Sequence, residues 1–445
     1  MLHGSLLLFM ERDNITFKYP DMFKQRTLFL ALLLLVPMSF MLVQCFSDKP
    51  QDPRDEVFAG SASCIKCHKD VYDSYLHTAH YLTSKPTSPD NIHGGFNVDD
   101  NSIKYADGSV VKMEKRNGGL YQVTYADSKE TEVHRMDITF GVNKAQTYMY
   151  WQGTQLFELP VSYYDKVHGW AGSPGYDGNR PDFGRPILQR CFECHSSFIR
   201  QQSQENRDMQ NRKVEFDPAS IIYGIDCERC HGPAANHVNY HEAYPEEKQP
   251  KYITRFASLT RAQKMDACGV CHSSSKQAFQ LSTFKFKMGD TLARFKEPDY
   301  LHSQTNNASL DVHGNQNGLL TASKCFMMSN MDCSTCHNTH VNNSGNLALY
   351  SQKCMSCHNN ANHNICKVAP KLSALMKNNC IDCHMPLKPS NTISIDDTAG
   401  NRNSLYLVRT HRIAVYPEES KKILAFVNDG SNMSLRGTKQ SHGRR

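Results

Sequence analysis

Apolar and polar residues alternate along several short stretches between residues 95 and 165. These stretches are Ile103–Tyr105, Val110–Met113, Leu120–Tyr125, Thr147–Trp151 and Gln155–Val161. A period of two is typical of β-strands with one buried face. Asp107-Gly108 and Asn117-Gly118-Gly119 separate the first three stretches, and such residues favour tight hairpin turns. The pattern therefore predicts a small antiparallel β subdomain over residues 95–165.

A continuous apolar run, Thr27–Val43, follows Lys24 and Arg26 near the N-terminus. This order is typical of an export signal, and the run is short for a membrane-spanning helix. Leu42-Val43-Gln44-Cys45 is similar to a lipoprotein box, in which the cysteine is lipidated, although Gln44 stands where a small residue is usual. We expect residues 1–45 to be an N-terminal extension with a signal or lipoprotein segment. An uncleaved anchor and simple secretion remain the alternatives.

The sequence Cys-x-x-Cys-His occurs seven times in the chain. It is the attachment signature of c-type haem: two thiols on one helical turn bond one porphyrin, and the histidine binds its iron. Zinc sites would require paired cysteine units that share a metal, without a fixed histidine. The sequence thus predicts seven covalently bound haem c groups. In chain order, motifs 1 to 7 are Cys64, Cys67 and His68; Cys191, Cys194 and His195; Cys227, Cys230 and His231; Cys268, Cys271 and His272; Cys333, Cys336 and His337; Cys354, Cys357 and His358; and Cys380, Cys383 and His384.

The composition indicates how such a chain folds. Only 39% of the residues are hydrophobic, so large porphyrins would replace much of an aliphatic core. We expect a mainly α, haem-organised fold with little regular structure, and the β subdomain inserted between motifs 1 and 2. That subdomain is either a lid over haem edges or a docking surface. The expected division is 46–94 for the first haem segment, 95–165 for the β insertion, 166–415 for a six-haem module and 416–445 for a disordered tail.

The net charge argues against nucleic acid as a partner. The formal charge is +6, but seven ferric haems of about −1 each would bring the loaded protein close to neutral. Long basic runs are also missing outside the termini. We therefore expect no nucleic-acid partner.

The second axial ligand of each iron decides between electron carriage and catalysis. Twelve histidines remain beyond the motifs and the terminal His3 and His442: His77, His80, His93, His134, His168, His237, His241, His302, His313, His340, His363 and His411. His340 and His363 follow motif histidines too closely to reach the opposite side of the same haem, so each should bind a neighbouring one. Met385 points away from the distal side of its haem, so we expect low-potential bis-histidine irons.

Several strings resemble the multihaem cytochromes c of the cytochrome c-554, hydroxylamine oxidoreductase and pentahaem nitrite reductase superfamily. They are SASCIKCHKDVYDSYLHTAH, CERCHGPAANH, DVHGNQNGLL, SKCFMMSNMDCSTCHNTH, CMSCHNNANHNIC, CIDCHMP and THRIAVY. The resemblance implies distal ligands at His80, His237, His313, His340, His363 and His411. It marks no seventh ligand; His168 is a weak choice, with His93, His241 and His302 behind it. The Cys-x-x-Cys-Lys haem of many nitrite reductases is absent, and we identify no counterpart of the cross-linking tyrosine of hydroxylamine oxidoreductases.

Two functions are consistent with these residues. The first is an electron carrier in a respiratory chain outside the cytoplasmic membrane, with a quinol oxidoreductase or other cytochromes as redox partners. The second is an oxidoreductase for a small nitrogen or sulfur oxyanion or hydroxylamine at one five-coordinate haem, with Arg135, Lys144 and Arg190 as weak pocket candidates. The sequence identifies no catalytic residue.

Two cysteines remain besides the motifs and Cys45. Cys325 and Cys366 flank motifs 5 and 6 from opposite sides. In an oxidising compartment they are candidates for a disulfide. Two separate buried thiols are the alternative.

Mature protein should carry seven covalent haems, because all seven attachment motifs are intact. Thioether bonds survive denaturation, so mass spectrometry of the denatured chain counts the haems directly. Six or fewer haems on fully matured protein would contradict this prediction.

Overall fold

The structure is a computed structural model of the 445-residue chain. It describes residues 52–98, 100–141, 144–176, 178–202, 214–273, 280–299, 310–362, 365–368, 372, 379–397 and 402–428. The chain divides into residues 1–51 and 52–445, and every described residue belongs to the second unit. The predicted export segment with Cys45 therefore lies outside the described residues. Among those that are described, no helix has both the length and the apolar character needed to cross a membrane.

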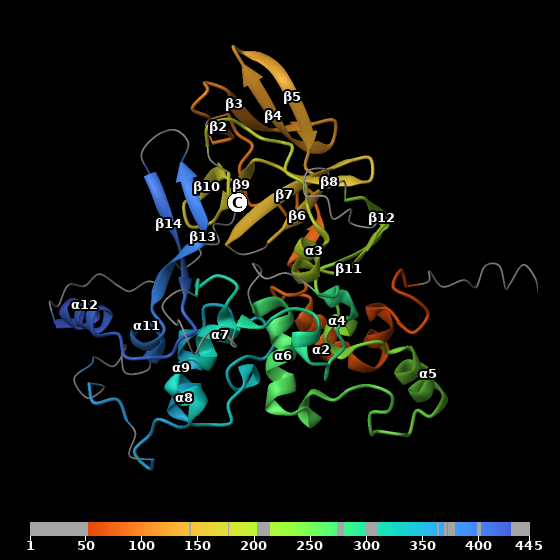
Figure 1. Cartoon of the computed structure of the whole chain (residues 1–445), viewed down its shortest axis with the longest axis vertical. Helices are drawn as coiled ribbons and strands as arrows, with labels where there is room; N and C mark the ends of the chain where they lie inside the picture. Colours follow the sequence, from red (N-terminus) through yellow and green to blue (C-terminus); the bar gives the residue numbers. More distant parts are fainter. Residues whose placement is uncertain are drawn as a thin grey trace, which may run out of the picture. The chain divides into compact units, whose positions relative to one another are not determined.

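A four-stranded antiparallel sheet forms where the alternating pattern predicts strands (Figure 1). Its order is β2 (Ser102–Lys104), β3 (Val110–Arg116), β4 (Gly119–Ala126) and β5 (Lys129–Arg135). Alternate side chains, among them Val111, Met113 and Val123, are fully buried. Asn117 and Gly118 between β3 and β4 have φ values of 46° and 75°, which suits a tight hairpin turn. The strands and the turn predicted here are confirmed.

A six-stranded antiparallel sheet follows. It contains β1 (Ser84–Pro86), β6 (Ile138–Phe140), β7 (Ala145–Gln152), β9 (Val161–Tyr164) and β10 (Gly169–Gly172) in that order, with β8 (Gln155–Glu158) paired to β7. Pro160, which has no N–H to donate, separates β8 from β9, so the predicted stretch Gln155–Val161 is not one strand. Tyr148, Val161 and Trp170 of this sheet share a buried core with side chains of the four-stranded sheet.

The expectation of a mainly α chain with only a small β subdomain is wrong. Helices make up 29% and strands 25% of the structure, in several antiparallel sheets. Two hairpins lie outside the predicted insertion: β11 (Ser196–Gln201) with β12 (Phe216–Tyr223), and β13 (Leu387–Asp397) with β14 (Arg402–Arg409). The sheets also bury apolar cores of their own, so porphyrins are not the only source of apolar burial.

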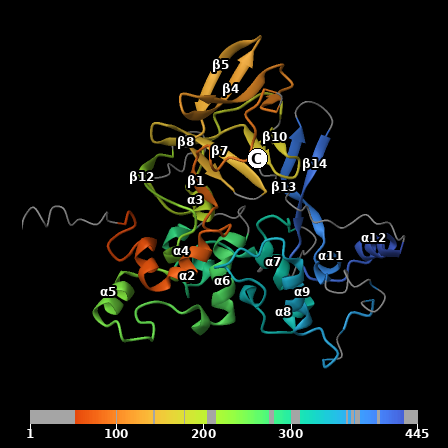
Figure 2. The ribbon, with the colours of Figure 1, turned by 180° about the vertical axis from the view of Figure 1, so that it is seen from behind.

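The motif-bearing part is built from short helices. They are η1 (Ser61–Cys64), α2 (Ile65–Tyr75), α3 (Gln189–His195), α4 (Cys227–His231), α5 (Ala235–Ala243), η2 (Phe256–Ser258), α6 (Arg261–His272), η3 (Thr283–Lys285), η4 (Leu292–Arg294), α7 (Gln316–Thr321), α8 (Lys324–Met327), η6 (Cys333–Thr335), α9 (Leu347–Met355), α11 (Cys380–His384) and α12 (Pro417–Asn428). Figures 1 and 2 show most of these helices on one side of the sheets in both views. Helix α12 occupies the start of the predicted tail, so that part is helical, and residues 429–445 lie outside the described residues.

Motif 2 is fixed to the sheets by its own apolar residue. Phe192, between Cys191 and Cys194, is fully buried and packs with Ile138, Phe140 and Phe216 of the strands. Burying a side chain of this size contributes about 1.5–3 kcal/mol. The sheets therefore position the second haem motif directly.

Candidate haem centres

The described haem motifs lie in short helices or at helix ends; motif 1 spans the junction of η1 and α2, where His68 has non-helical backbone angles. Motifs 3 and 7 coincide with α4 and α11, while motifs 2 and 4 form the C-terminal ends of α3 and α6. In motifs 5 and 6 the backbone N–H of the histidine donates to the carbonyl of the first cysteine, at 3.0 and 2.9 Å. This turn puts both thiols and the imidazole on one side of the backbone, as haem attachment requires.

Four motif histidines face a second histidine from a distant part of the chain. The ring centres of His68 and His237 are 6.5 Å apart, and those of His231 and His340 are 6.0 Å apart. The pairs His272–His80 and His337–His411 have ring-centre distances of 6.1 and 6.2 Å.

These distances fit one metal ion between each pair. A metal–imidazole bond is about 2.0–2.1 Å in zinc sites, and the ring centre lies roughly 1 Å beyond the nitrogen, so opposite imidazoles on one metal have centres roughly 6 Å apart. Iron–imidazole bonds are of similar length. The residues present therefore fit haem iron with two axial histidines, and the four second histidines are among the predicted distal ligands.

Hydrogen bonds at Nδ1 orient several of these rings. His237 Nδ1 is 2.8 Å from the Lys251 carbonyl oxygen, and His384 Nδ1 is 2.9 Å from that of Ala414. The Thr83 hydroxyl lies 3.2 Å from His195 Nδ1. A partner at Nδ1 leaves Nε2 for the metal and fixes the plane of the ring.

Burial favours the neutral form of seven of these imidazoles. Burial, reinforced by neighbouring histidines, lowers the pKa of His80, His195 and His411 to about 4. Burial also lowers the pKa of His231, His313, His337 and His340. A neutral imidazole keeps the lone pair that iron binding requires.

The other predicted distal ligands are placed less clearly. His313 lies close enough to His195 to affect its charge, but the two rings do not form a facing pair like the four above. His363 and His302 lie outside the described residues. His168 is exposed in the turn between β9 and β10, with φ 49°, and the structure does not bring it together with a motif histidine. His93 bonds to Asp165 at 3.1 Å, whereas His241 packs against His237.

The residues predicted to line a substrate pocket lie on different elements of the fold. Arg135 ends β5 and faces Asp137 at 3.7 Å, Lys144 directly precedes β7, and Arg190 lies in α3. Cys325 and Cys366 are not bridged in the structure. The Cys325 thiol is near those of Cys336 and Cys357, while Cys366 is near Cys383 of motif 7.

Cysteines of different motifs meet in four places. Their thiols lie close enough to affect one another's pKa in the pairs Cys64–Cys227, Cys194–Cys271, Cys268–Cys333 and Cys354–Cys380. These contacts join motif 1 to 3, motif 2 to 4, motif 4 to 5 and motif 6 to 7. Haems attached to cysteines this close together would themselves be neighbours.

Sequence reasoning missed a buried charge cluster that joins motifs 1 and 3. The Arg54 guanidinium contacts Asp52 and Asp226 at 2.8 Å and Glu228 at 3.1 Å. The Arg54 side chain is only 6% exposed. A buried cation needs such partners to offset its desolvation.

Glu228 itself lies inside motif 3, between the two cysteines. Its carboxylate accepts backbone N–H groups from Ala59 and Gly60, both at 2.9 Å, and from Ala234 at 2.8 Å. Ala59 and Gly60 directly precede η1, which carries Cys64 of motif 1. An acidic residue between the cysteines was the available sequence signal.

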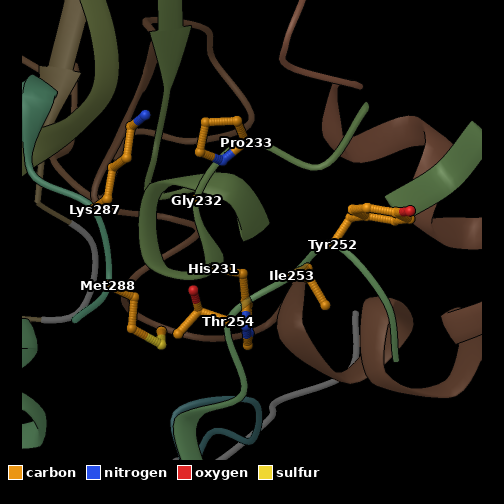
Figure 3. Close-up of a pocket in the computed structure, with 8 residues that line it drawn as sticks. All are labelled: His231, Gly232, Pro233, Tyr252, Ile253, Thr254, Lys287 and Met288. Atoms are coloured by element: carbon orange, nitrogen blue, oxygen red, sulfur yellow. The ribbon is translucent and has the colours of Figure 1, made fainter. Parts of the chain in front are cut away.

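A cavity of about 340 Å³ adjoins the imidazole of motif 3 (Figure 3). Its lining combines apolar groups with the donors Tyr252, Thr254 and Lys287. An apolar ring with carboxylate substituents, such as a haem edge, matches this lining. The lining residues are His231, Gly232, Pro233, Tyr252, Ile253, Thr254, Lys287 and Met288.

Part of the chain is similar to a known protein family, and most of it shares its fold with a solved structure. Residues 179–232, which include motifs 2 and 3, match the family described as cytochrome c554 and c-prime. No curated protein matches the chain at a significant level. The crystal structure of outer cell wall cytochrome OcwA aligns with a TM-score of 0.52 and 16% identity, over 82% of this chain and 81% of that one. At this identity the likeness establishes a shared fold.

Replacing Glu228 by Gln should lower the free energy of unfolding of the haem-loaded protein by about 3 kcal/mol. All four partners of the carboxylate donate hydrogen bonds, so an amide N–H₂ would face donors only. Urea unfolding followed by circular dichroism measures the change.

Glu193→Gln is the matched control for this prediction. Glu193 also lies between the two cysteines of its motif and is also buried, but it accepts from the hydroxyls of Ser282 and Thr283 at 2.6 and 2.9 Å and from the side-chain amide of Gln189 at 3.1 Å, which can flip. Hydroxyls can turn and accept from an amide. If the two variants lost the same free energy of unfolding, the surroundings of Glu228, which contain only hydrogen-bond donors, would not be the cause of its destabilisation.

Proposed function

We propose that this chain is a heptahaem c-type cytochrome that carries electrons. The match of residues 179–232 to the family described as cytochrome c554 and c-prime, and the fold shared with OcwA, support a multihaem cytochrome. Bound haem supplies reversible one-electron exchange at its iron. The polypeptide contributes the covalent attachment, the axial ligands and the spacing between neighbouring motifs.

The four facing imidazole pairs are the observation that carries this proposal. In each pair a motif histidine would hold the iron from one side, and a distant histidine from the other: His237, His340, His80 and His411 for motifs 1, 3, 4 and 5. An iron with two protein ligands has no free position for a substrate, which favours electron exchange over substrate chemistry. Ligation by histidine rather than methionine favours low reduction potentials.

The contacts between motifs support transfer from one haem to the next. Each of the four cysteine pairs joins two motifs, and motif 4 takes part in two of them. These contacts form three groups, motifs 1 and 3, motifs 2, 4 and 5, and motifs 6 and 7, and within each group electrons would pass from one motif to the next without leaving the protein. Suitable partners are other redox proteins, such as a quinol oxidoreductase or further cytochromes.

A second function rests on the irons without a facing imidazole. No histidine in the described part of the chain forms such a ring pair with His195 or His384. Should one of these irons be five-coordinate, it could bind hydroxylamine or a small nitrogen or sulfur oxyanion. The protein would then be a multihaem oxidoreductase.

Spectroscopy of the oxidised protein separates the two functions. The carrier should show seven low-spin irons in electron paramagnetic resonance and optical spectra, and its reduced form should not bind carbon monoxide. These readouts test the coordination of every iron, including motifs 2, 6 and 7. A single high-spin iron that binds carbon monoxide would favour the oxidoreductase.

We place this carrier outside the cytoplasmic membrane. The export signal expected in residues 1–45 supports this location, and OcwA, which has a similar fold, is an outer cell wall cytochrome. Lipidation of Cys45 would tether the protein to a membrane, provided that more than one acyl chain is attached.

Cys45→Ser should release haem-loaded protein into the soluble exported fraction, because the variant cannot be lipidated. Fractionation followed by haem staining measures the distribution. A variant that stays in the membrane with its N-terminal segment uncleaved would indicate a helical anchor, and wild-type protein that is already soluble would indicate an ordinary signal peptide.

A further inference from the structure

The facing imidazole pairs differ in one respect, the angle between their ring planes. The planes are nearly parallel in His68–His237 and His231–His340, at 14° and 11°. In His337–His411 the angle is 26°. The His272–His80 pair stands apart with 83°, so its two rings are almost perpendicular.

The perpendicular pair belongs to the motif with contacts to two others. Cys271 of motif 4 meets Cys194 of motif 2, and Cys268 meets Cys333 of motif 5. Each of the other motifs takes part in one such contact. Motif 4 therefore links motifs 2 and 5 among the contacts described.

The orientation of His272 is set by the neighbouring helix α7. The first residue of that helix, Gln316, has its amide oxygen 3.4 Å from His272 Nδ1. Helix α7 lies close against α6, because Gly269 within motif 4 has no side chain: a Cβ there would be 2.7 Å from Asn317 Nδ2. Asn317 Nδ2 also donates to the Met265 carbonyl in α6, at 3.2 Å.

The backbone of His80 is fixed by a separate part of the chain. Its backbone carbonyl accepts the N–H of Ile225 at 2.9 Å and of Thr83 at 3.3 Å. Gly224, with φ +64°, permits this approach, since a Cβ at that position would be 2.0 Å from the Tyr81 carbonyl oxygen. Separate parts of the chain thus position the two residues whose rings lie at 83° to each other.

Ring orientation changes the electronic structure of a low-spin ferric iron. Two parallel imidazoles donate π-density into the same iron d orbital and raise it above its partner, which stabilises the ferric state. Perpendicular imidazoles donate into different orbitals and leave the two nearly degenerate. The consequences are a strongly anisotropic resonance signal at low field and a reduction potential that is higher than for parallel ligands in an otherwise equal site.

We propose that motif 4 is an electronically distinct link between motifs 2 and 5, with crossed axial imidazoles from His272 and His80, and that Gln316 is the positioning residue that keeps them crossed. The proposal rests on the ligand pairing of the proposed function. With its potential raised in this way, the central site would collect electrons from the neighbouring motifs.

Low-temperature electron paramagnetic resonance of the oxidised holoprotein tests the crossed planes. Wild-type protein should show a low-field, strongly anisotropic low-spin signal together with ordinary rhombic signals. His80→Ala should abolish the low-field signal and create one high-spin iron without changing the haem count. His340→Ala is the matched control, since its pair is parallel: it should create a high-spin iron, remove a rhombic signal and leave the low-field signal intact.

The outcomes separate failure of this inference from failure of the ligand pairing. If His80→Ala produced no high-spin iron, the pairing itself would be wrong. If it produced one while the low-field signal persisted, or if wild-type protein had no such signal, only the crossed planes at motif 4 would be refuted.

Gln316→Leu tests the positioning residue. It should shift or abolish the low-field signal while leaving seven low-spin haems, because only the hydrogen bond to His272 Nδ1 is removed. Tyr350→Phe is the control, as it removes the hydroxyl 3.5 Å from His337 Nδ1 and should leave the low-field signal unchanged. An unchanged signal in Gln316→Leu would refute the role of Gln316.

Discussion

The opposed imidazole pair is the interaction on which this architecture depends. A haem motif supplies two thiols and one axial histidine within five residues, so it can form wherever the chain makes a helical turn. The second histidine has to come from elsewhere and must lie opposite the first, with ring centres roughly 6 Å apart. In four motifs this condition is met by residues far away in the chain. Each such pair would therefore tie two distant segments together once iron is bound.

The apolar sheets and the buried charges give these segments fixed positions before any ligand is considered. Phe192 anchors motif 2 in the core between strands, and Phe140 of β6 stacks on His195 with ring centres 4.8 Å apart. Arg54 and Glu228 perform the corresponding task between motifs 1 and 3 with charge-assisted hydrogen bonds. Because such groups are costly to bury without partners, the cluster tolerates little displacement. Rigid attachment of this kind suits a protein whose proposed task is to keep redox centres at constant separation.

Short-range patterns account for the parts of the structure that could be predicted from the sequence. The motifs are defined by spacings of three and four residues, and one helical turn places residues with these spacings on the same side of the backbone. The first hairpins are defined by strict alternation and by Asn117-Gly118 in the turn. Hairpins β11–β12 and β13–β14 were not predicted. Pro218 and Pro389 lie within their strands, and the register shifts in both pairs, so no clean period of two is visible.

The sequence by itself determined where covalent haem can attach and which histidine follows each attachment, because both depend on neighbours along one turn. It also determined a set of candidate distal histidines. Only the tertiary structure decided which candidate faces which motif, that His272 and His80 are crossed while His231 and His340 are parallel, and that Glu228 anchors motif 1 as well as motif 3. These features depend on distances between residues that are remote along the chain, and such distances are set by the packing of sheets and helices together.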